Sequence, residues 1–292
     1  MNIKITADST CDLSEALLRQ WNISLIPMHI LMGEESYLDG VTIHPVDVFA
    51  HAQNGGKMPK SAAPNLVEYT DFLAPFARDY DAVIHINVGS KFSSCFQNAR
   101  LAAQEFGNVY VVDSENICTG QGYLVLQAAK WAADGLPPKN ISMRLQGLAK
   151  RVELSFVLNQ LDYMAKSGRC SGVLAFGANI LGIKPMILFK EGEIFSAGVA
   201  RGRQKSFEKA LDLLMTYLAE HNGTPDDYCI TVGYGYDADE GKRLWMQTRA
   251  ALRAKYPAAQ CEVGLLQIGC TIAVHTGPYA LGMGIMRRWK KQ

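Results

Sequence analysis

The chain has 292 residues and a mass of 32.1 kDa, with 48% hydrophobic and 20% charged residues. This composition excludes a disordered chain, and the length suggests two domains or one large one. The 29 basic and 28 acidic residues give a formal net charge of +1. A whole-molecule field that would attract nucleic acid is therefore absent, which counts against a DNA-associated or regulatory protein, and we expect no nucleic-acid partner.

Cysteine spacing and apolar runs indicate where the protein functions. The seven cysteines are scattered and contain no CxxC pair, which favours reduced core and loop residues over a disulfide framework or zinc site. Residues 1–5 lack the apolar run of a signal peptide. The apolar stretches 171–189 and 263–286 contain glycine and proline in mid-run, so we interpret them as buried elements. We expect a cytoplasmic protein with no metal, no cofactor and no membrane insertion.

The first half repeats one unit, in which an apolar strand, a small polar loop and a helix follow one another. The expected strands are 3–7, 24–31, 82–88 and 109–112, and the expected helices are 13–21, 93–106, 119–134 and 141–150. Asp12 is the expected N-cap of the first helix, and Ser93 or Ser90 that of the second. This alternation predicts an α/β fold, with a mainly parallel sheet between two helical layers.

The second half has a different pattern of elements. The expected strands are 153–158, 183–190, 193–200, 228–234, 262–268 and 271–274, and the expected helices are 160–166 and 207–218. The strands on either side of Glu191-Gly192 are expected to form a hairpin. This order predicts a smaller α+β domain with a mixed sheet. We place the domain boundary near residue 150, which gives domains 1–150 and 151–292.

The polar loops that follow the parallel strands indicate a ligand site. Ligands of parallel sheets bind outside the carboxyl ends of the strands. This rule brings together loops 8–10, 89–94 and 113–114, all of which contain serine or threonine. Loop 89–94 also precedes a helix, whose free N–H groups and dipole favour an anion. We expect a small anionic group near Ser93, unless the serines of this loop only cap their helix.

Most enzyme motifs are absent: the sequence contains no GxGxxG, Walker A, GxSxG or HExxH pattern. Gly120-Gln121-Gly122 is interpreted as a tight turn. Asp8 and Asp113 could form a carboxylate pair, but hydrogen-bonding roles are the simpler interpretation. His275 is expected to end an apolar strand. It is either a core histidine or, with Ser93 as nucleophile, part of a stand-alone hydrolase or phosphotransferase.

Short motifs occur in a fixed order from residue 3 to about residue 286. They are Thr6–Leu13 (TADSTCDL), Tyr37–Gly40 (YLDG), Ser61–Pro64 (SAAP), Gly89–Ala99 (GSKFSSCFQNA), Val112–Ser114 (VDS), Gly168–Ser171 (GRCS), Ile183–Pro185 (IKP), Arg201–Arg203 (RGR) and His275–Pro278 (HTGP). With this set, the chain resembles the DegV family, whose members include the fatty-acid-binding subunit of bacterial fatty acid kinase. The resemblance implies a DegV-like fold.

The resemblance also implies a lipid carrier rather than a free-standing enzyme. Members of the family hold one long-chain fatty acid in an apolar tunnel, with its carboxylate near the domain interface. A separate ATP-dependent kinase subunit phosphorylates that carboxylate to an acyl-phosphate. On this basis domain 1–150 would supply the carboxylate site, and domain 151–292 the acyl tunnel with its histidine and arginine loops. No residue of this chain is then expected to be catalytic.

The family's ligand-binding positions carry over to six residues of this sequence. These are the carboxylate-binding hydroxyls, a neighbouring serine, a histidine and two basic positions linked to the head group or to kinase docking: Ser61, Ser93, Ser94, His275, Arg169 and Arg201. Neutral hydroxyls hold a carboxylate without a buried ion pair, whose desolvation would be costly. About 14 methylenes of a 16-carbon chain would contribute roughly 11 kcal/mol of gross apolar burial.

Several positions depart from the family pattern. Ser94 stands where a glycine usually lets the backbone approach the head group, and Phe96 lacks the usual phenol hydroxyl. Cys95 and Ala62 replace hydroxyl residues, and Tyr279 stands where glycine is common. These changes bear on acyl-chain preference and kinase coupling. Candidates for the tunnel lining are six apolar residues: Leu174, Phe176, Ile180, Leu181, Met186 and Ile187.

Overall fold

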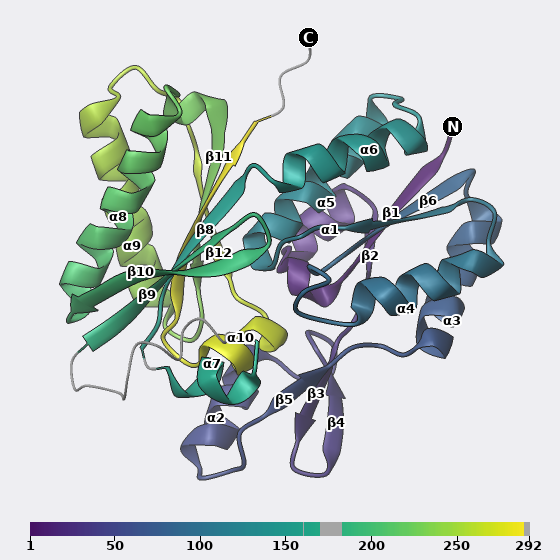
Figure 1. Cartoon of the computed structure of the whole chain (residues 1–292), viewed down its shortest axis with the longest axis horizontal. Coiled ribbons are helices and arrows are strands. Elements are labelled where there is room, and N and C mark those ends of the chain that lie inside the picture. Colours follow the sequence, from purple (N-terminus) through teal and green to yellow (C-terminus); the bar gives the residue numbers. More distant parts are fainter. Residues whose placement is uncertain (160, 170–182, 289–292) are drawn as a thin grey trace. The chain divides into compact units, whose positions relative to one another are not determined.

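The computed structural model describes residues 1–159, 161–169 and 183–288, and Figure 1 shows its elements. The chain divides into two compact units. Unit 1 comprises Met1–Lys150 and Gly269–Ile272, and unit 2 comprises Arg151–Ile268 and Ala273–Gln292.

Unit 1 contains a four-stranded parallel sheet in the order β2-β1-β6-β7. Its strands are β1 (Ile3–Asp8), β2 (Ile23–Ile26), β6 (Ala82–Asn87) and β7 (Val109–Asp113). All six residues of β6 are buried, as expected for a strand covered on both faces. A small antiparallel sheet in the order β4-β3-β5 is formed by β3 (His29–Met32), β4 (Glu35–Leu38) and β5 (Lys60–Ala62).

Helices cover both faces of the parallel sheet. Those of unit 1 are α1 (Glu15–Gln20), α2 (Pro45–Gln53), α3 (Leu66–Asp79), α4 (Cys95–Ala102), α5 (Cys118–Ala133) and α6 (Pro138–Ala149), with 3₁₀ turns η1 (Ser9–Cys11) and η2 (Ala103–Glu105). Helices α3 and α4 pack together, as do α5 and α6, and the two pairs lie on opposite faces (Figure 1). The predicted α/β/α arrangement is confirmed.

Unit 2 is built on a six-stranded mixed sheet in the order β10-β9-β8-β13-β11-β12. The strands are β8 (Val152–Val157), β9 (Ile183–Lys190), β10 (Glu193–Arg201), β11 (Tyr228–Tyr234), β12 (Val263–Gln267) and β13 (Leu281–Arg287). Only the β11–β12 pair is parallel among these described strands. The predicted mixed sheet is confirmed.

Two long helices pack on the sheet of unit 2. They are α8 (Arg203–Glu220) and α9 (Ala238–Lys255), and the shorter elements are α7 (Asp162–Ser167) and η4 (Pro225–Asp227). The buried face of α8 includes Phe207, Leu214 and Leu218, which belong to one core cluster with Tyr228 and Ile230 of β11. The helical spacing of these apolar residues explains why this helix was predictable.

The expected strand 24–31 is two strands. Strand β2 ends at Ile26 and β3 begins at His29, with Pro27 between them. Proline has no N–H to donate to a ladder, and its ring fixes φ, so a continuous strand ends there. The two strands consequently belong to different sheets.

The expected strand 271–274 is wrong, because residues Cys270–Thr276 form helix α10. A short apolar run does not distinguish a buried strand from a buried helix. The residue that stabilises the start of this helix is distant in the sequence. Asp39 accepts hydrogen bonds from the backbone N–H groups of Cys270 and Thr271, at 3.0 and 3.1 Å, and so caps the start of α10.

Other local expectations also differ from the structure. Asp12 does not cap α1: it has a left-handed φ of 50°, and Ser14 is the N-cap. Gly120–Gly122 lie inside α5 rather than in a turn. Helix α4 is shorter than the expected 93–106, because the 3₁₀ turn η2 follows it. Elements α2, α3, α9, β4, β5 and β13 were not expected.

Candidate functional site

The carboxylate of Asp8 organises the carboxyl edge of the parallel sheet. It is fully buried at the end of β1 and accepts hydrogen bonds from the Val88 N–H at 2.8 Å and from the Gln121 side-chain amide at 3.0 Å. The Thr10 N–H also donates to it, at 3.2 Å. Burial raises the pKa of Asp8, and these hydrogen bonds oppose that shift. Asp8 therefore ties the loop after β1 to the loop after β6 and to α5.

Asp113 has a similar role at the end of β7. It accepts the Ser90 N–H at 3.1 Å and the Glu115 N–H at 2.9 Å. Asp8 and Asp113 thus each bind separate backbone donors, which agrees with the hydrogen-bonding interpretation. Gly89 lies close to the same segment, because a Cβ placed on it would be 3.2 Å from the Asn116 nitrogen. The start of the loop that carries Ser93 is therefore fixed by the segment that follows β7.

Ser93 and Ser94 form the entry to helix α4. The half-buried Ser93 hydroxyl donates to the Cys95 Sγ at 3.1 Å and accepts the Cys95 N–H at 3.3 Å. Ser94 is the N-cap residue, is exposed, and makes no capping hydrogen bond through its side chain. Its φ of −76° is available to any residue, so the backbone here does not require glycine.

Ser61 lies in the same unit, on β5, where it is half-buried and opposite Ile30 of β3. The segment that follows β5 contacts α4, because the Asn98 side chain donates to the Pro64 carbonyl at 2.8 Å. Ala63 also packs on the core cluster that contains Cys95. The segment that follows Ser61 therefore packs on helix α4, which begins two residues after Ser93.

A buried polar network lies behind this edge. His85 contacts the Thr6 hydroxyl at 2.9 Å and the Asn87 amide at 3.0 Å, and that amide also donates to the Tyr69 hydroxyl at 3.0 Å. Burial lowers the pKa of His85 to about 3, so its imidazole is neutral at physiological pH. The sequence analysis did not predict this network, because its members lie at positions whose pattern is that of ordinary buried strand or helix residues.

Two further aspartates hold the segment Gly269–Thr271 in unit 1. Asp12 accepts the Gly269 N–H at 3.0 Å, and Asp39 accepts the Thr271 hydroxyl at 2.6 Å as well as two backbone donors. Burial raises the pKa of Asp12 well above its ordinary value. Both aspartates stand in motifs that were recognised, but the motifs gave no indication of this contact.

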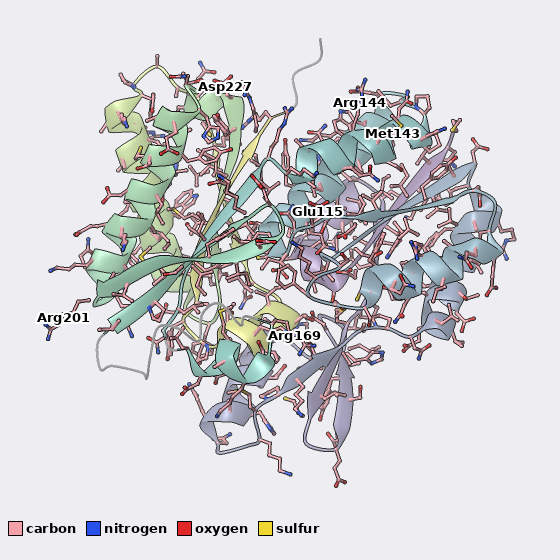
Figure 2. All side chains as sticks on the ribbon, in the orientation of Figure 1. Glu115, Met143, Arg144, Arg169, Arg201 and Asp227 are labelled. Atoms are coloured by element: carbon pink, nitrogen blue, oxygen red, sulfur yellow. The ribbon has the colours of Figure 1, made fainter. Side chains whose placement is uncertain are left out.

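In unit 2 the charge of Arg169 acts on His275. His275 is in the last turn of α10, and its pKa is lowered to about 4, first by burial and then by the charge of Arg169. A neutral imidazole is therefore present at physiological pH. Arg169 is exposed just after α7, where its guanidinium donates to the Ser167 carbonyl at 2.6 Å (Figure 2).

The two arginines of the Arg201–Arg203 motif have different environments. Arg201 is exposed at the end of β10 and points away from the ribbon (Figure 2). Arg203 forms a two-pronged ion pair with the buried carboxylate of Glu240, with its Nε 3.0 Å from Oε1. Arg203 therefore stabilises the packing of unit 2, while Arg201 is available at the surface.

The His275–Pro278 motif continues into a tight turn. Gly277 has a φ of 77°, and a Cβ on it would lie 2.5 Å from the Tyr163 ring. Tyr279 has a φ of 61°, in the left-handed region where glycine is favoured. Its ring meets the Tyr236 ring edge-on at 5.9 Å, a contact that glycine could not make. Tyr279, at a position where glycine is common in the family, therefore combines a strained backbone with an aromatic contact.

Four of the six tunnel candidates, Leu174, Phe176, Ile180 and Leu181, lie outside the described residues. Met186 and Ile187 are buried on β9. Within residues 1–159, 161–169 and 183–288, no group of three His, Cys, Asp or Glu side chains is placed to hold a metal ion. No helix of those ranges has both the length and the apolarity to cross a membrane.

These features define a two-unit α/β protein whose parallel sheet ends in loops that carry hydroxyl groups and aspartates. A family model described as an uncharacterised protein of the DegV family matches residues 2–288, so the chain belongs to the DegV family.

Solved structures of relatives match over nearly the whole chain. A DegV family protein from Thermus thermophilus, described as fatty acid binding, is 27% identical with a TM-score of 0.88, covering 99% of this chain and 100% of that one. A stearic-acid-binding protein from Eubacterium ventriosum is 29% identical with a TM-score of 0.89, covering 98% of each chain. DegV from Bacillus subtilis, described as a fatty acid binding protein, is 26% identical with a TM-score of 0.85, covering 99% of this chain and 100% of that one.

Proposed function

We propose that this protein binds one long-chain fatty acid, with its carboxylate at the hydroxyl-bearing edge of the parallel sheet in residues 1–150. The observation that carries the proposal is the whole-chain match to three fatty-acid-binding relatives at TM-scores of 0.85 to 0.89. The packing of the segment after Ser61 on helix α4 supports it, because two hydroxyls and a helix start suit one carboxylate.

The hydrogen bond that Ser93 makes is compatible with this role. Its hydroxyl donates to the Cys95 sulfur, which is a weak acceptor. A carboxylate oxygen is a much stronger acceptor, so turning the hydroxyl toward it would be favourable.

The finer proposal is that the bound carboxylate is presented to a separate ATP-dependent kinase subunit. Neutral donors leave the carboxylate nucleophilic enough to attack the γ-phosphoryl group, with ADP as the leaving group and acyl-phosphate as the product. Arginines at the surface could bind the partner or stabilise the transferring phosphoryl charge. Arg201 and Arg169 are exposed and suit that role.

Hydroxyl removal tests the carboxylate site. We expect Ser93→Ala and Ser61→Ala each to weaken fatty-acid affinity by about 10- to 100-fold, since a hydrogen bond to a charged group is worth roughly 1.5–3 kcal/mol. Displacement of a fluorescent fatty acid measures the affinity. Ser142→Ala is the control, because the Ser142 hydroxyl bonds only to the Pro138 carbonyl of its own helix among the described contacts. Unchanged affinity in both test variants would contradict the placement of the site.

The kinase step has its own test. With ATP, the lipid-loaded protein alone should form no acyl-phosphate. Addition of a fatty acid kinase subunit should produce acyl-phosphate, which is detected as the hydroxamate that forms when hydroxylamine traps it. Arg201→Ala should slow this reaction while leaving fatty-acid affinity unchanged. Turnover by the isolated chain that Ser93→Ala abolishes would instead identify a stand-alone enzyme.

A further inference from the structure

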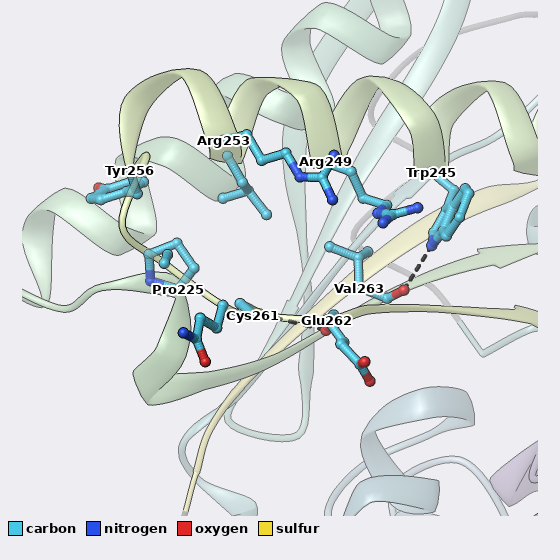
Figure 3. A pocket seen from close by; sticks show the side chains of 11 residues that line it. Pro225, Trp245, Arg249, Arg253, Tyr256, Cys261, Glu262 and Val263 are labelled. Carbon is cyan, nitrogen blue, oxygen red and sulfur yellow. Dashed lines mark hydrogen bonds between the residues drawn. The ribbon is translucent and has the colours of Figure 1, made fainter.

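A cavity lies in unit 2, between helix α9 and the segment that leads into β12. Its volume is about 460 Å³, which is within the range of small-molecule sites. Trp245, Arg249 and Arg253 line it from α9, and residues 260–263 line it from the opposite side (Figure 3). Tyr256, at the end of α9, lines one end. Every lining residue belongs to unit 2.

The charge in this cavity is predominantly positive. Arg249 and Arg253 are one helical turn apart, and Figure 3 shows both guanidinium groups on the side of α9 that faces the opposite segment. Glu262 is the one acidic residue among those that line the cavity, and its side chain extends away from the arginines (Figure 3). Among the described residues, neither guanidinium has a carboxylate within ion-pair distance. An anion would therefore bind two cations that lack an acidic partner.

Helix-end electrostatics do not account for both arginines. Arg253 and Lys255 stand in the last turn of α9, where basic residues interact favourably with the helix dipole. Arg249 precedes that turn, so the dipole has little effect on it. Its guanidinium instead lies over the Trp245 ring, 4.3 Å from the ring centre. The Trp245 indole donates to the Val263 carbonyl at 2.7 Å, which fixes the ring and with it the arginine.

We propose that this cavity binds a small phosphate ester that carries a planar ring. Two planar guanidinium forks supply more donors than one carboxylate can accept, and they match the geometry and charge of a phosphate dianion. The ring of the half-buried Tyr256 and the buried side chains of Leu252 and Pro225 provide an apolar end for the ring of the ligand. This site is separate from the proposed fatty-acid site and does not depend on it.

Calorimetric titration of the full chain with ADP tests this inference, with pyrophosphate and adenosine as the two partial ligands. We expect one site per chain and tighter binding of ADP than of either partial ligand. Arg249→Gln with Arg253→Gln should weaken ADP binding at least tenfold. Lys242→Gln removes one positive charge from an exposed position on α9, as Arg253→Gln does, and should leave ADP binding unchanged.

Three results would overturn the inference: no ADP binding, ADP binding that survives the double substitution, or equal affinity for ADP and pyrophosphate. Far-UV circular dichroism and the melting temperature show whether each variant is folded. If the double variant does not fold, Arg253→Gln alone should still weaken binding severalfold. Arg253 is exposed, so this substitution leaves the core intact.

Discussion

At the scale of single residues, buried aspartates connect segments that are far apart in the sequence. Asp8 binds donors from the loop after β6 and from α5, and Asp39 binds the start of α10 more than 200 residues later. An ionised carboxylate accepts several hydrogen bonds and donates none, so it suits positions where backbone N–H groups converge.

The pKa of His275 gives a prediction at this scale. We expect its imidazole to be neutral at pH 5.5, because burial and Arg169 lower its pKa to about 4. The folded protein then binds this proton less readily than the unfolded chain, whose histidine titrates near 6.5. The stability contributed by neutral His275 is complete above about pH 6.5 and decreases as the pH falls toward 4.

Nitrogen-15 NMR of the histidine side chains measures the pKa of His275 directly, with His275→Gln used to assign the signals. A His275 signal that titrates near pH 6.5 would contradict the account. The variant should also lose less stability than the native protein between pH 6.5 and 4.

At the scale of elements, helix α5 packs unusually closely on η1. Gly122 is buried in α5, and a Cβ on it would lie 2.4 Å from the Cys11 carbonyl oxygen. No rotamer change can relieve a contact with backbone. The Gly120–Gly122 segment therefore serves helix packing, and its small residues allow Gln121 to reach Asp8.

Two glycine substitutions test this packing. Gly122→Ala should destabilise the protein by about 1–3 kcal/mol, because overpacking outweighs the better helix propensity of alanine. Gly147→Ala is the matched control: it lies in α6, is exposed and has nothing within 4 Å of the new Cβ. It should stabilise by roughly 0.5–1 kcal/mol. Urea unfolding measures the change in the free energy of unfolding for both variants. Equal changes would contradict the close packing, because they would show that α5 can shift freely.

Elements with strong local signals were predictable from the sequence. Strand β11 and the β9–β10 hairpin agree with their expected limits to within one residue, and the amphipathic pattern identified α8. Helix α10 could not be predicted locally, because its cap is Asp39. The division of 24–31 was visible in Pro27, but the two resulting sheets depend on tertiary pairing.

The candidate site, too, could be predicted only where its residues carry a local sequence signal. The polar loops after the expected parallel strands, together with the helix that follows loop 89–94, pointed to Ser93. Ser61 has no such local signal and was reached only through the DegV resemblance. Its proximity to α4 depends on the Asn98–Pro64 hydrogen bond, which joins residues 34 positions apart.

At the scale of the whole molecule, the proposed ligand is one fatty acid per chain. The net charge of +1 provides no long-range attraction for an anion, so affinity has to come from burial of the acyl chain and from local hydrogen bonds. A gross gain of roughly 11 kcal/mol for a 16-carbon chain permits a ligand that survives purification.

Organic extraction of the purified, denatured protein followed by lipid mass spectrometry tests this claim most directly. The account predicts about one equivalent of long-chain fatty acid per chain, and its identity would define the acyl preference. An empty extract, together with no uptake of added fatty acids, would contradict the account.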